Sequence, residues 1–391
     1  MKKILLIGMA DSVHLANWLE NMAGLPVDVT LISSSPHRRL HPKIVGLIGT
    51  ASQIGMRLAM PNWSRYFGFL FWLIDRPLGE RLRGKLVRNL IQKLKPDLVH
   101  VVEFQHAGYI LLRALARPLV VERPKIMASN YGSDIYWFQR LSHHKSKIST
   151  LLEMSDHYTS ECQRDIALAK QLGFAGTSTL IPNTGGVSED LLLRQPRISV
   201  ASERKLLLLK GYHNKFGQAL IGVRSILRLR KSLIGFEIVS FSTNVFTALF
   251  LILLRLFSGL NISFHLKGAL THSEVLTLMS RARIYVGLSK SDGISTSLLE
   301  AMAMGTFPLQ TGTSCASEWI EDGLSGAILT LGKEDELDNW ITRAISDDNL
   351  VNKAQELNHA AILARYTMSA MTSQVENLYL KAVSGEVSDK P

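Results

Sequence analysis

Cysteine is nearly absent from this chain of 391 residues, which contains only Cys162 and Cys315. Two cysteines so far apart in the sequence suit neither a disulfide framework nor a thiolate metal site of the usual spacing. The scarcity of cysteine is typical of a protein of the reducing cytoplasm. The longest apolar run, residues 245–260, contains Arg255 and is shorter than the roughly 20 residues that span a bilayer. We expect this run to form a buried or surface-lying helix, with membrane insertion as the alternative.

The amino terminus lacks the long apolar region of a signal peptide, because only residues 4–7 separate the first two lysines from Gly8. It predicts a first buried strand instead. The composition, with 46% hydrophobic and 20% charged residues and 12 prolines, excludes disordered, collagen-like and coiled-coil chains. The length exceeds what one hydrophobic core usually serves and therefore predicts two domains.

Acidic residues are scarce in one region. The net charge is +11, and residues 38–95 contain 12 Lys and Arg but only 2 Asp and Glu. This region includes the aromatic stretch 63–72 and a predicted helix with Arg81, Lys85, Arg88 and Lys95 opposite its apolar face. Cations mixed with aromatic side chains favour an anionic membrane surface, with a solvated helix face over an aromatic core as the alternative. Nucleic acid is not an expected partner, because the sequence has no recognisable nucleic-acid-binding module.

Short apolar segments alternate with helical patterns along almost the whole chain, which predicts an α/β protein with parallel sheets covered on both faces. We expect two doubly wound, Rossmann-like domains that face each other across a cleft. The expected domains are residues 1–187 and 204–362, with a linker at 188–203 and a helix in 363–391 that crosses back to the first domain. The expected strands are residues 3–7, 27–32, 98–102, 124–129, 179–181, 205–209, 236–241, 262–266, 284–288 and 306–310.

Two motifs follow predicted strands of the second domain. The loop 289–295 leads into a predicted helix, and Asp292 and Glu300 lie eight positions apart around the helix start. Gly293 permits close backbone approach and successive helix-start amides supply donors, so this pattern suits a ligand rich in hydroxyls and phosphates. Lys210 and Lys215 follow the strand 205–209, where two cations suit a diphosphate.

The stretch SDGISTSLLEAMAMGTFPLQ, residues 291–310, resembles the Glu-x7-Glu phrase of the family 4 retaining glycosyltransferases, with Asp292 at the first glutamate and Glu300 at the second. Residues 318–326 resemble the downstream I-x-D-G-x-x-G segment of that family. The resemblance implies a GT-B fold and a nucleotide diphosphate sugar as donor. It also implies that Glu300 binds the ribose, while Asp292 and the amides of Gly293, Ile294 and Ser295 hold the donor sugar.

The same resemblance implies that Lys210 and Lys215 replace the family's Arg-x4-Lys pair and clasp the donor diphosphate. Because the chain has no Asp-x-Asp triplet and these cations can stand in for a metal, we expect no metal and no other cofactor. A Gly-x-Gly-x-x-Gly dinucleotide fingerprint is also missing after the first strand, which makes a nicotinamide enzyme a weak interpretation.

The acceptor-side candidates lie in the first domain. Ser12 and His14 follow the first strand, with a capping serine and a first-turn histidine as the structural alternative. Residues 130–134 resemble the family's His-Gly-x-Asp segment, with Tyr131 at the histidine position followed by Gly132 and Asp134. Around the end of the preceding strand we also consider His100, Glu103 and His106, each of which has a structural role as its alternative.

The sequence therefore predicts a cytoplasmic retaining glycosyltransferase, peripheral on the inner face of the membrane. It would move a sugar from a nucleotide diphosphate donor to a hydroxyl of a saccharide, in particular a lipid-linked one, in the synthesis of a bacterial surface polysaccharide such as lipopolysaccharide. The transferred group would be a hexosyl or N-acetylhexosaminyl group. Two alternatives stay open: a nucleotide-sugar 2-epimerase of the same fold and a catalytically silent sugar-nucleotide binding protein.

Overall fold

The computed structural model describes residues 1–35, 40–49, 57–58, 70, 73–75, 77–183, 185–193 and 199–384. The chain divides into two compact units. Unit 1 comprises Met1–Gly186 and Ser369–Pro391, and unit 2 comprises Val187–Met368. The stretch 188–203, expected as a linker, belongs to unit 2 and contains the short helix α9 (Glu189–Leu193).

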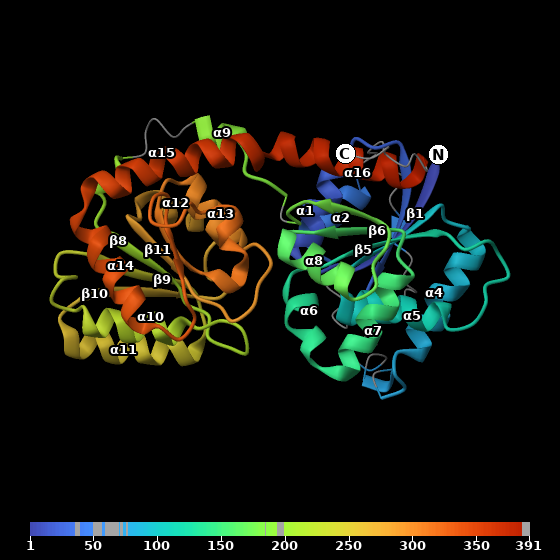
Figure 1. Ribbon diagram of the computed structural model, residues 1–391, viewed down its shortest axis with the longest axis horizontal. Helices are drawn as coiled ribbons and strands as arrows, with labels where there is room; N and C mark the ends of the chain where they lie inside the picture. The colour runs from blue at the N-terminus through green and yellow to red at the C-terminus, as the bar shows by residue number, and fades with distance from the viewer. Residues whose placement is uncertain are drawn as a thin grey trace. The chain divides into compact units, whose positions relative to one another are not determined.

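Unit 1 is built on a parallel sheet of seven strands in the order β3-β2-β1-β4-β5-β6-β7. Figure 1 labels β1, β5 and β6 of this sheet. The strands are β1 (Lys2–Gly8), β2 (Val27–Ser33), β3 (Arg57–Leu58), β4 (Leu98–Val102), β5 (Lys125–Ser129), β6 (His157–Ser160) and β7 (Thr177–Leu180). The helices are α1 (Val13–Asn21), α2 (Pro42–Gly49), α4 (Arg81–Leu94), η1 (Phe104–Gly108), α5 (Tyr109–Leu115), α6 (Ser133–Tyr136), η2 (Phe138–Arg140), α7 (Ser142–Glu153), α8 (Gln163–Gln171) and α16 (Met368–Ser384).

Unit 2 has a parallel sheet of six strands in the order β10-β9-β8-β11-β12-β13. The strands are β8 (Leu206–Lys210), β9 (Glu237–Thr243), β10 (Asn261–Leu266), β11 (Ile284–Gly287), β12 (Phe307–Thr311) and β13 (Ala327–Leu329). Besides α9, the helices are η4 (Ala201–Glu203), α10 (Ala219–Arg228), α11 (Val245–Ser258), α12 (His272–Arg281), α13 (Thr296–Ala303), η5 (Gly312–Ser314), η6 (Ala316–Glu318), α14 (Glu334–Ser346) and α15 (Asp348–Arg365).

Both sheets follow the Rossmann order, in which the first strand of the unit lies in the middle and the chain then reverses direction across the sheet. The expectation of an α/β protein with two doubly wound units is therefore confirmed. All ten expected strands are present, but β3, β6 and β13 were not expected. β6 reads His-Tyr-Thr-Ser and β13 has only three residues, so neither provides the apolar run from which the other strands were predicted.

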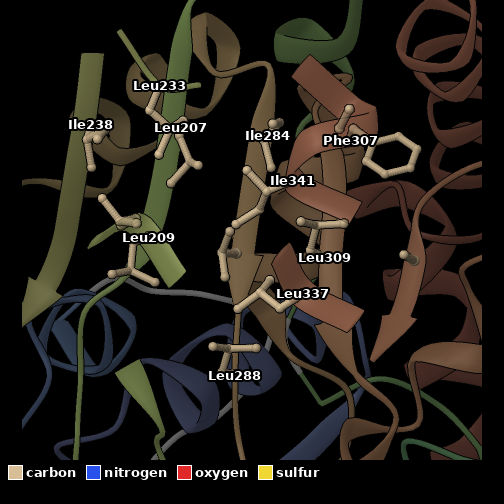
Figure 2. Close-up of a cluster of buried hydrophobic side chains, with 14 of the residues drawn as sticks. Leu207, Leu209, Leu233, Ile238, Ile284, Leu288, Phe307, Leu309, Leu337 and Ile341 are labelled. Atoms are coloured by element: carbon tan, nitrogen blue, oxygen red, sulfur yellow. The ribbon is translucent and has the colours of Figure 1, made fainter. Parts of the chain in front are cut away.

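The core of unit 2 fixes the two central strands. Leu209 of β8, Ile284 of β11 and Leu309 of β12 belong to one fully buried cluster, which Ile341 of α14 joins (Figure 2). Burial of apolar surface from both faces explains why these strands read as continuous apolar runs. The cluster holds the ends of β8 and β11 in a fixed register.

The long apolar run of the sequence forms helix α11. Asn244 caps its start by accepting from the Thr247 amide, and Gly259 ends it with a φ of 69°. The helix lies on the surface of unit 2, in agreement with the expectation of a buried or surface-lying helix. No helix in the described part of the chain is long and apolar enough to cross a membrane.

Candidate functional site

The candidate site of unit 2 lies where the strand order reverses. β8 and β11 are neighbours in the sheet, while the connections from them run to opposite sides. Ligands of such sheets bind beyond the carboxyl ends of the strands at this point. The loops after β8 and β11 are joined there, because the Gln218 amide donates to Leu288 O at 2.9 Å and the Lys290 amide to Phe216 O at 2.8 Å.

Lys210 is the central cation of this site. It is the last residue of β8, and its Nζ donates to Ser295 Oγ at 3.2 Å. Burial lowers the pKa of Lys210, while the nearby carboxylates of Asp292 and Glu300 act in the opposite direction. The structure thus brings Lys210, Asp292, Ser295 and Glu300 together, as the sequence predicted.

The start of α13 supplies the backbone of the site. Ser295 is the N-cap residue, but its hydroxyl is engaged by Lys210 and makes no capping bond to the helix. Asp292 Oδ1 accepts from the Gly293 amide at 3.0 Å, and Gly293, Ile294 and Ser295 are buried. Helix starts present amides that suit anions, so the cation and the dipole of α13 favour a phosphate at the same place.

Glu300 lies in the second turn of α13 and has a partner that the sequence analysis missed. Its Oε1 lies 2.7 Å from Nε2 of His272, the first residue of α12. The Glu300 side chain is 13% exposed and that of His272 is 70% exposed. A carboxylate offers about four acceptor positions, so Glu300 can hold His272 and still accept from a ligand hydroxyl.

The loop after β8 passes close to β9. A Cβ on Gly211 would lie 2.1 Å from Ser240 Oγ and 2.6 Å from Thr243 Oγ1, so only glycine fits at this position. The next residue, Tyr212, is half-buried, and Lys210 Nζ lies 5.1 Å from the centre of its ring. Tyr212 was not among the predicted site residues, because a single tyrosine in a loop carries no spacing signal.

Lys215 is placed differently from Lys210. It is exposed in the loop after β8, and its Nζ lies 5.3 Å from the centre of the Phe216 ring. Its role at a diphosphate stays a prediction.

In unit 1, the structure brings His14 and Tyr131 together. Their ring centres lie 5.8 Å apart, at the carboxyl ends of β1 and β5. Ser12 is the N-cap of α1 and accepts from the His14 amide at 3.2 Å, which is the structural alternative stated for it. Burial raises the pKa of Tyr131 well above its ordinary value, and the Glu161, Glu103 and Asp134 carboxylates add to this effect.

Asp134 and Glu103 form a buried carboxylate pair beside Tyr131. Asp134 accepts from the amides of Tyr131 at 2.9 Å and Phe104 at 3.2 Å, and burial and Glu103 raise its pKa well above the ordinary value. Gly132 precedes it with a φ of 80°. Glu103 accepts from the His106 amide at 2.9 Å, and burial raises its pKa to about 7.

The two histidines near β4 have opposite environments. His106 is exposed in η1 and stays an acceptor-side candidate. His100 is fully buried, with Nδ1 2.6 Å from Tyr379 Oη and Nε2 2.7 Å from Ser129 Oγ. The acceptor contact considered for His100 is therefore wrong, because both ring nitrogens are bonded inside unit 1.

Two family models match parts of this chain. Residues 249–362 match the family model of the group 1 glycosyl transferases, and residues 75–160 match the glycosyl transferase 4-like model. None of the curated protein sequences compared with this chain matches it significantly.

Three solved structures illustrate the shared fold. Sucrose-phosphate synthase (tll1590) from Thermosynechococcus elongatus has a TM-score of 0.71 at 13% identity, over 99% of this chain and 100% of that one. Anabaena Alr3699/HepE in complex with UDP-glucose has a TM-score of 0.66 at 12% identity, over 97% and 100%. The lipopolysaccharide outer core galactosyltransferase WaaB has a TM-score of 0.64 at 12% identity, over 98% and 100%.

The chain has two Rossmann-like units, and its fold matches these structures over nearly its whole length. The fold is therefore of the GT-B class. With the two family models, the chain is identified as a GT-B glycosyltransferase of the family 4-like type.

Proposed function

We propose that the protein is a retaining glycosyltransferase that uses a nucleotide diphosphate sugar and a lipid-linked saccharide acceptor in bacterial surface polysaccharide synthesis. The observation that carries this proposal is the convergence of Lys210, Asp292, Ser295 and Glu300 at the point where the sheet of unit 2 reverses its order. The similar structures support it, because one is described with UDP-glucose and another is a lipopolysaccharide galactosyltransferase. The hexosyl or N-acetylhexosaminyl identity of the transferred sugar is part of the proposal.

Each side chain has a separate task in this proposal. Glu300 accepts from the ribose hydroxyls, and Lys210, aided by Lys215 and the start of α13, holds the diphosphate. Asp292 and the Gly293, Ile294 and Ser295 amides hold the donor sugar. As the bond between the sugar and the diphosphate breaks, charge develops on the leaving oxygen, and a preformed cation stabilises it without reorganisation. We propose that these residues act without a metal or another cofactor.

The acceptor is assigned to unit 1. His14, Tyr131, Gly132 and Asp134 lie near one another at the carboxyl ends of its strands, and Ser12 and His106 belong to neighbouring loops. In a single-step reaction, retention requires the acceptor oxygen to bond to the anomeric carbon on the face from which the diphosphate leaves. Positioning of the hydroxyl therefore contributes much of the barrier reduction.

Membrane association completes the proposal and places the protein on the cytoplasmic face of an anionic membrane. Arg81, Lys85 and Lys93 are exposed on α4. Arg88 instead donates to the backbone oxygens of Ala114 and Arg117, so it also holds unit 1 together. Residues 63–72, the aromatic part of this segment, lie outside the described residues except for position 70.

The test of the proposed reaction starts with a thermal-shift screen that selects a nucleotide sugar, because a ligand of the folded state raises the melting temperature. Turnover of that donor is then followed with and without saccharide acceptors, and the anomeric configuration of the product is read by NMR. Lys210→Met should lower turnover about a hundredfold, the scale for losing one electrostatic stabiliser. Lys205→Met, at the opposite end of β8, is the matched control.

Three outcomes would contradict the proposal. A free nucleotide-linked epimer formed without acceptor would indicate the 2-epimerase. Binding without hydrolysis or transfer would indicate a silent binding protein. Full turnover in Lys210→Met would remove the central cation from the mechanism.

A further inference from the structure

Helix α11 of unit 2 presents an apolar face to solvent. Among the described residues, its exposed fractions run from 41% for Phe250 to 84% for Phe257. The exposed apolar side chains, called here the α11 face, are Val245, Phe246, Leu249, Phe250, Leu253, Leu256 and Phe257. An ordinary surface helix carries polar residues on its solvent side, whereas α11 carries apolar residues there as well as on its buried side.

The α11 face is continuous along the helix. Its members recur every three or four positions, the spacing that aligns side chains on one side of an α-helix. The rings of Phe246 and Phe250 pack with centres 5.2 Å apart. The opposite side, with Leu251 and Leu254, is buried in the unit. Figure 1 shows α11 as an outer helix of unit 2 beside α10, and a contiguous exposed apolar surface of this kind marks an interaction site.

Cations lie near both ends of the α11 face. Residues 211–271 contain seven Lys and Arg but one acidic residue, Glu237, which is paired with Arg281 at 2.8 Å. Two of the seven, Arg224 and Arg228, are paired with acidic residues of α14, so the positive excess rests on the other five. The helix itself has no Asp or Glu, and Arg255 is exposed in its last turn. At the other end, the His213 ring lies 6.1 Å from that of Phe246. Burial, Lys290 and Arg224 lower the pKa of His213, which places further cations near this end.

We propose that the α11 face docks on an anionic lipid bilayer, with the helix lying in the headgroup region. Apolar side chains flanked by cations are the recognition chemistry of an interfacial helix. At about 1.5 Å per residue, the 14 residues of α11 extend about 21 Å, short of the roughly 30 Å hydrocarbon core, so the helix lies along the surface.

Electrostatics favour a bilayer over a second copy of this chain. An interface between two α11 faces would bring Arg255 and the neighbouring cations of both copies together, and like charges across an interface disfavour association. Acidic lipids supply the complementary charge instead. This proposal rests on the membrane association proposed above and adds a contact surface in the other unit.

The test compares two triple variants in vesicle flotation. Phe250→Ser, Leu253→Ser and Phe257→Ser together remove exposed apolar surface from α11 without touching its buried side. The matched control replaces Val120, Leu363 and Leu380 by Ser, three apolar residues that are 44–89% exposed elsewhere. Vesicles contain phosphatidylcholine alone or with 30% phosphatidylglycerol.

The wild type should float with the anionic vesicles only, and salt should weaken its binding. The α11 triple variant should partition at least tenfold more weakly, while the control triple variant keeps wild-type binding. The thermal shift caused by the nucleotide sugar that the screen selects should be unchanged in the α11 variant, which shows that the variant is folded.

Three results would overturn this proposal. In the first, the α11 variant binds anionic vesicles as well as the wild type does. In the second, the wild type binds neither kind of vesicle. In the third, the wild type is a dimer and the α11 variant is a monomer. If instead the proposed function is wrong, the wild type shows no thermal shift with nucleotide sugars, and vesicle binding is unaffected. The variant Arg81→Glu with Lys85→Glu reports separately on α4.

Discussion

Glu103 combines two unusual features at one position of unit 1. Its backbone has a φ of 78°, a region that non-glycine residues rarely adopt, and its carboxyl group is buried. The amides of His106 and Ala107 donate to it, yet burial raises its pKa from 4.5 to about 7. The bonds to the amides thus offset only part of the cost of burying the charge.

This pKa predicts a pH dependence of stability. Between about pH 4.5 and 7 the folded state keeps the Glu103 proton that the unfolded state has released, so the free energy of unfolding falls as the pH rises. Glu103→Gln keeps an acceptor oxygen but does not titrate, and its melting temperature should fall less over this window. Melting curves from pH 5 to 8 check this, with Glu122→Gln at an exposed position as control. Equal slopes in Glu103→Gln and wild type would show that this carboxyl does not govern the effect.

Spacing in the sequence was informative for some site residues and not for others. Lys210, Asp292 and Glu300 were predictable because Lys210 ends a strand, Asp292 and Glu300 lie on either side of a helix start, and parallel strands end at one edge of the sheet. His272 was not, because it reaches Glu300 from α12, 28 positions earlier in the chain. His100 was misjudged as an acceptor candidate, since only packing reveals that Tyr379 of α16 covers it.

At the scale of elements, α16 is held to the rest of unit 1 by a buried polar network. Tyr379 Oη accepts from Trp18 Nε1 at 2.9 Å and lies 2.6 Å from His100 Nδ1. All three rings are buried, and Tyr379 meets Trp18 and His100 edge-on. One hydroxyl therefore joins the carboxyl-terminal helix to α1 and β4.

Removing this hydroxyl should loosen α16. Tyr379→Phe keeps the ring but leaves the Trp18 and His100 nitrogens without this partner, at a cost of about 1–3 kcal/mol for a buried unsatisfied group. Denaturant unfolding followed by Trp fluorescence measures the loss. Tyr136→Phe, on a half-buried ring that Arg140 and Arg164 cover, should cost little. A loss no larger than that of the control would mean that packing alone holds α16.

The predictability of elements follows from their burial. Strands such as β8 and β11 are buried on both faces and read as apolar runs, whereas β6 carries a polar tetrapeptide that a sequence pattern does not separate from a loop. Thr271 and Glu274 form a capping box at the start of α12, and its Thr-x-x-Glu spacing is visible in the sequence because the bonds are local. The apolar exposed side of α11 was not predicted, since composition does not reveal which side faces solvent.

At the scale of the whole molecule, the first six strands of each unit follow the same order in their sheet, and unit 1 adds a seventh at one edge. The repeated alternation of strands and helices predicted this, because a parallel sheet needs a helix in each crossover. The carboxyl-terminal half of the chain is nearly neutral in total but contains a basic segment. Residues 201–391 have 19 Lys and Arg against 18 Asp and Glu, yet seven of the cations and one acid lie within 211–271.

The central claim is that unit 2 binds a nucleoside diphosphate with Lys210 on the phosphates and Glu300 on the ribose. Calorimetric titration of a nucleoside and its diphosphate into wild type, Lys210→Met, Glu300→Ala and Lys205→Met tests it most directly. Lys210→Met should weaken the diphosphate at least tenfold and leave the nucleoside unchanged. Glu300→Ala should weaken both ligands by about 1.5–3 kcal/mol, the scale of a hydrogen bond to a charged group, while Lys205→Met changes neither. Wild-type affinity for the diphosphate in both Lys210→Met and Glu300→Ala would contradict this account.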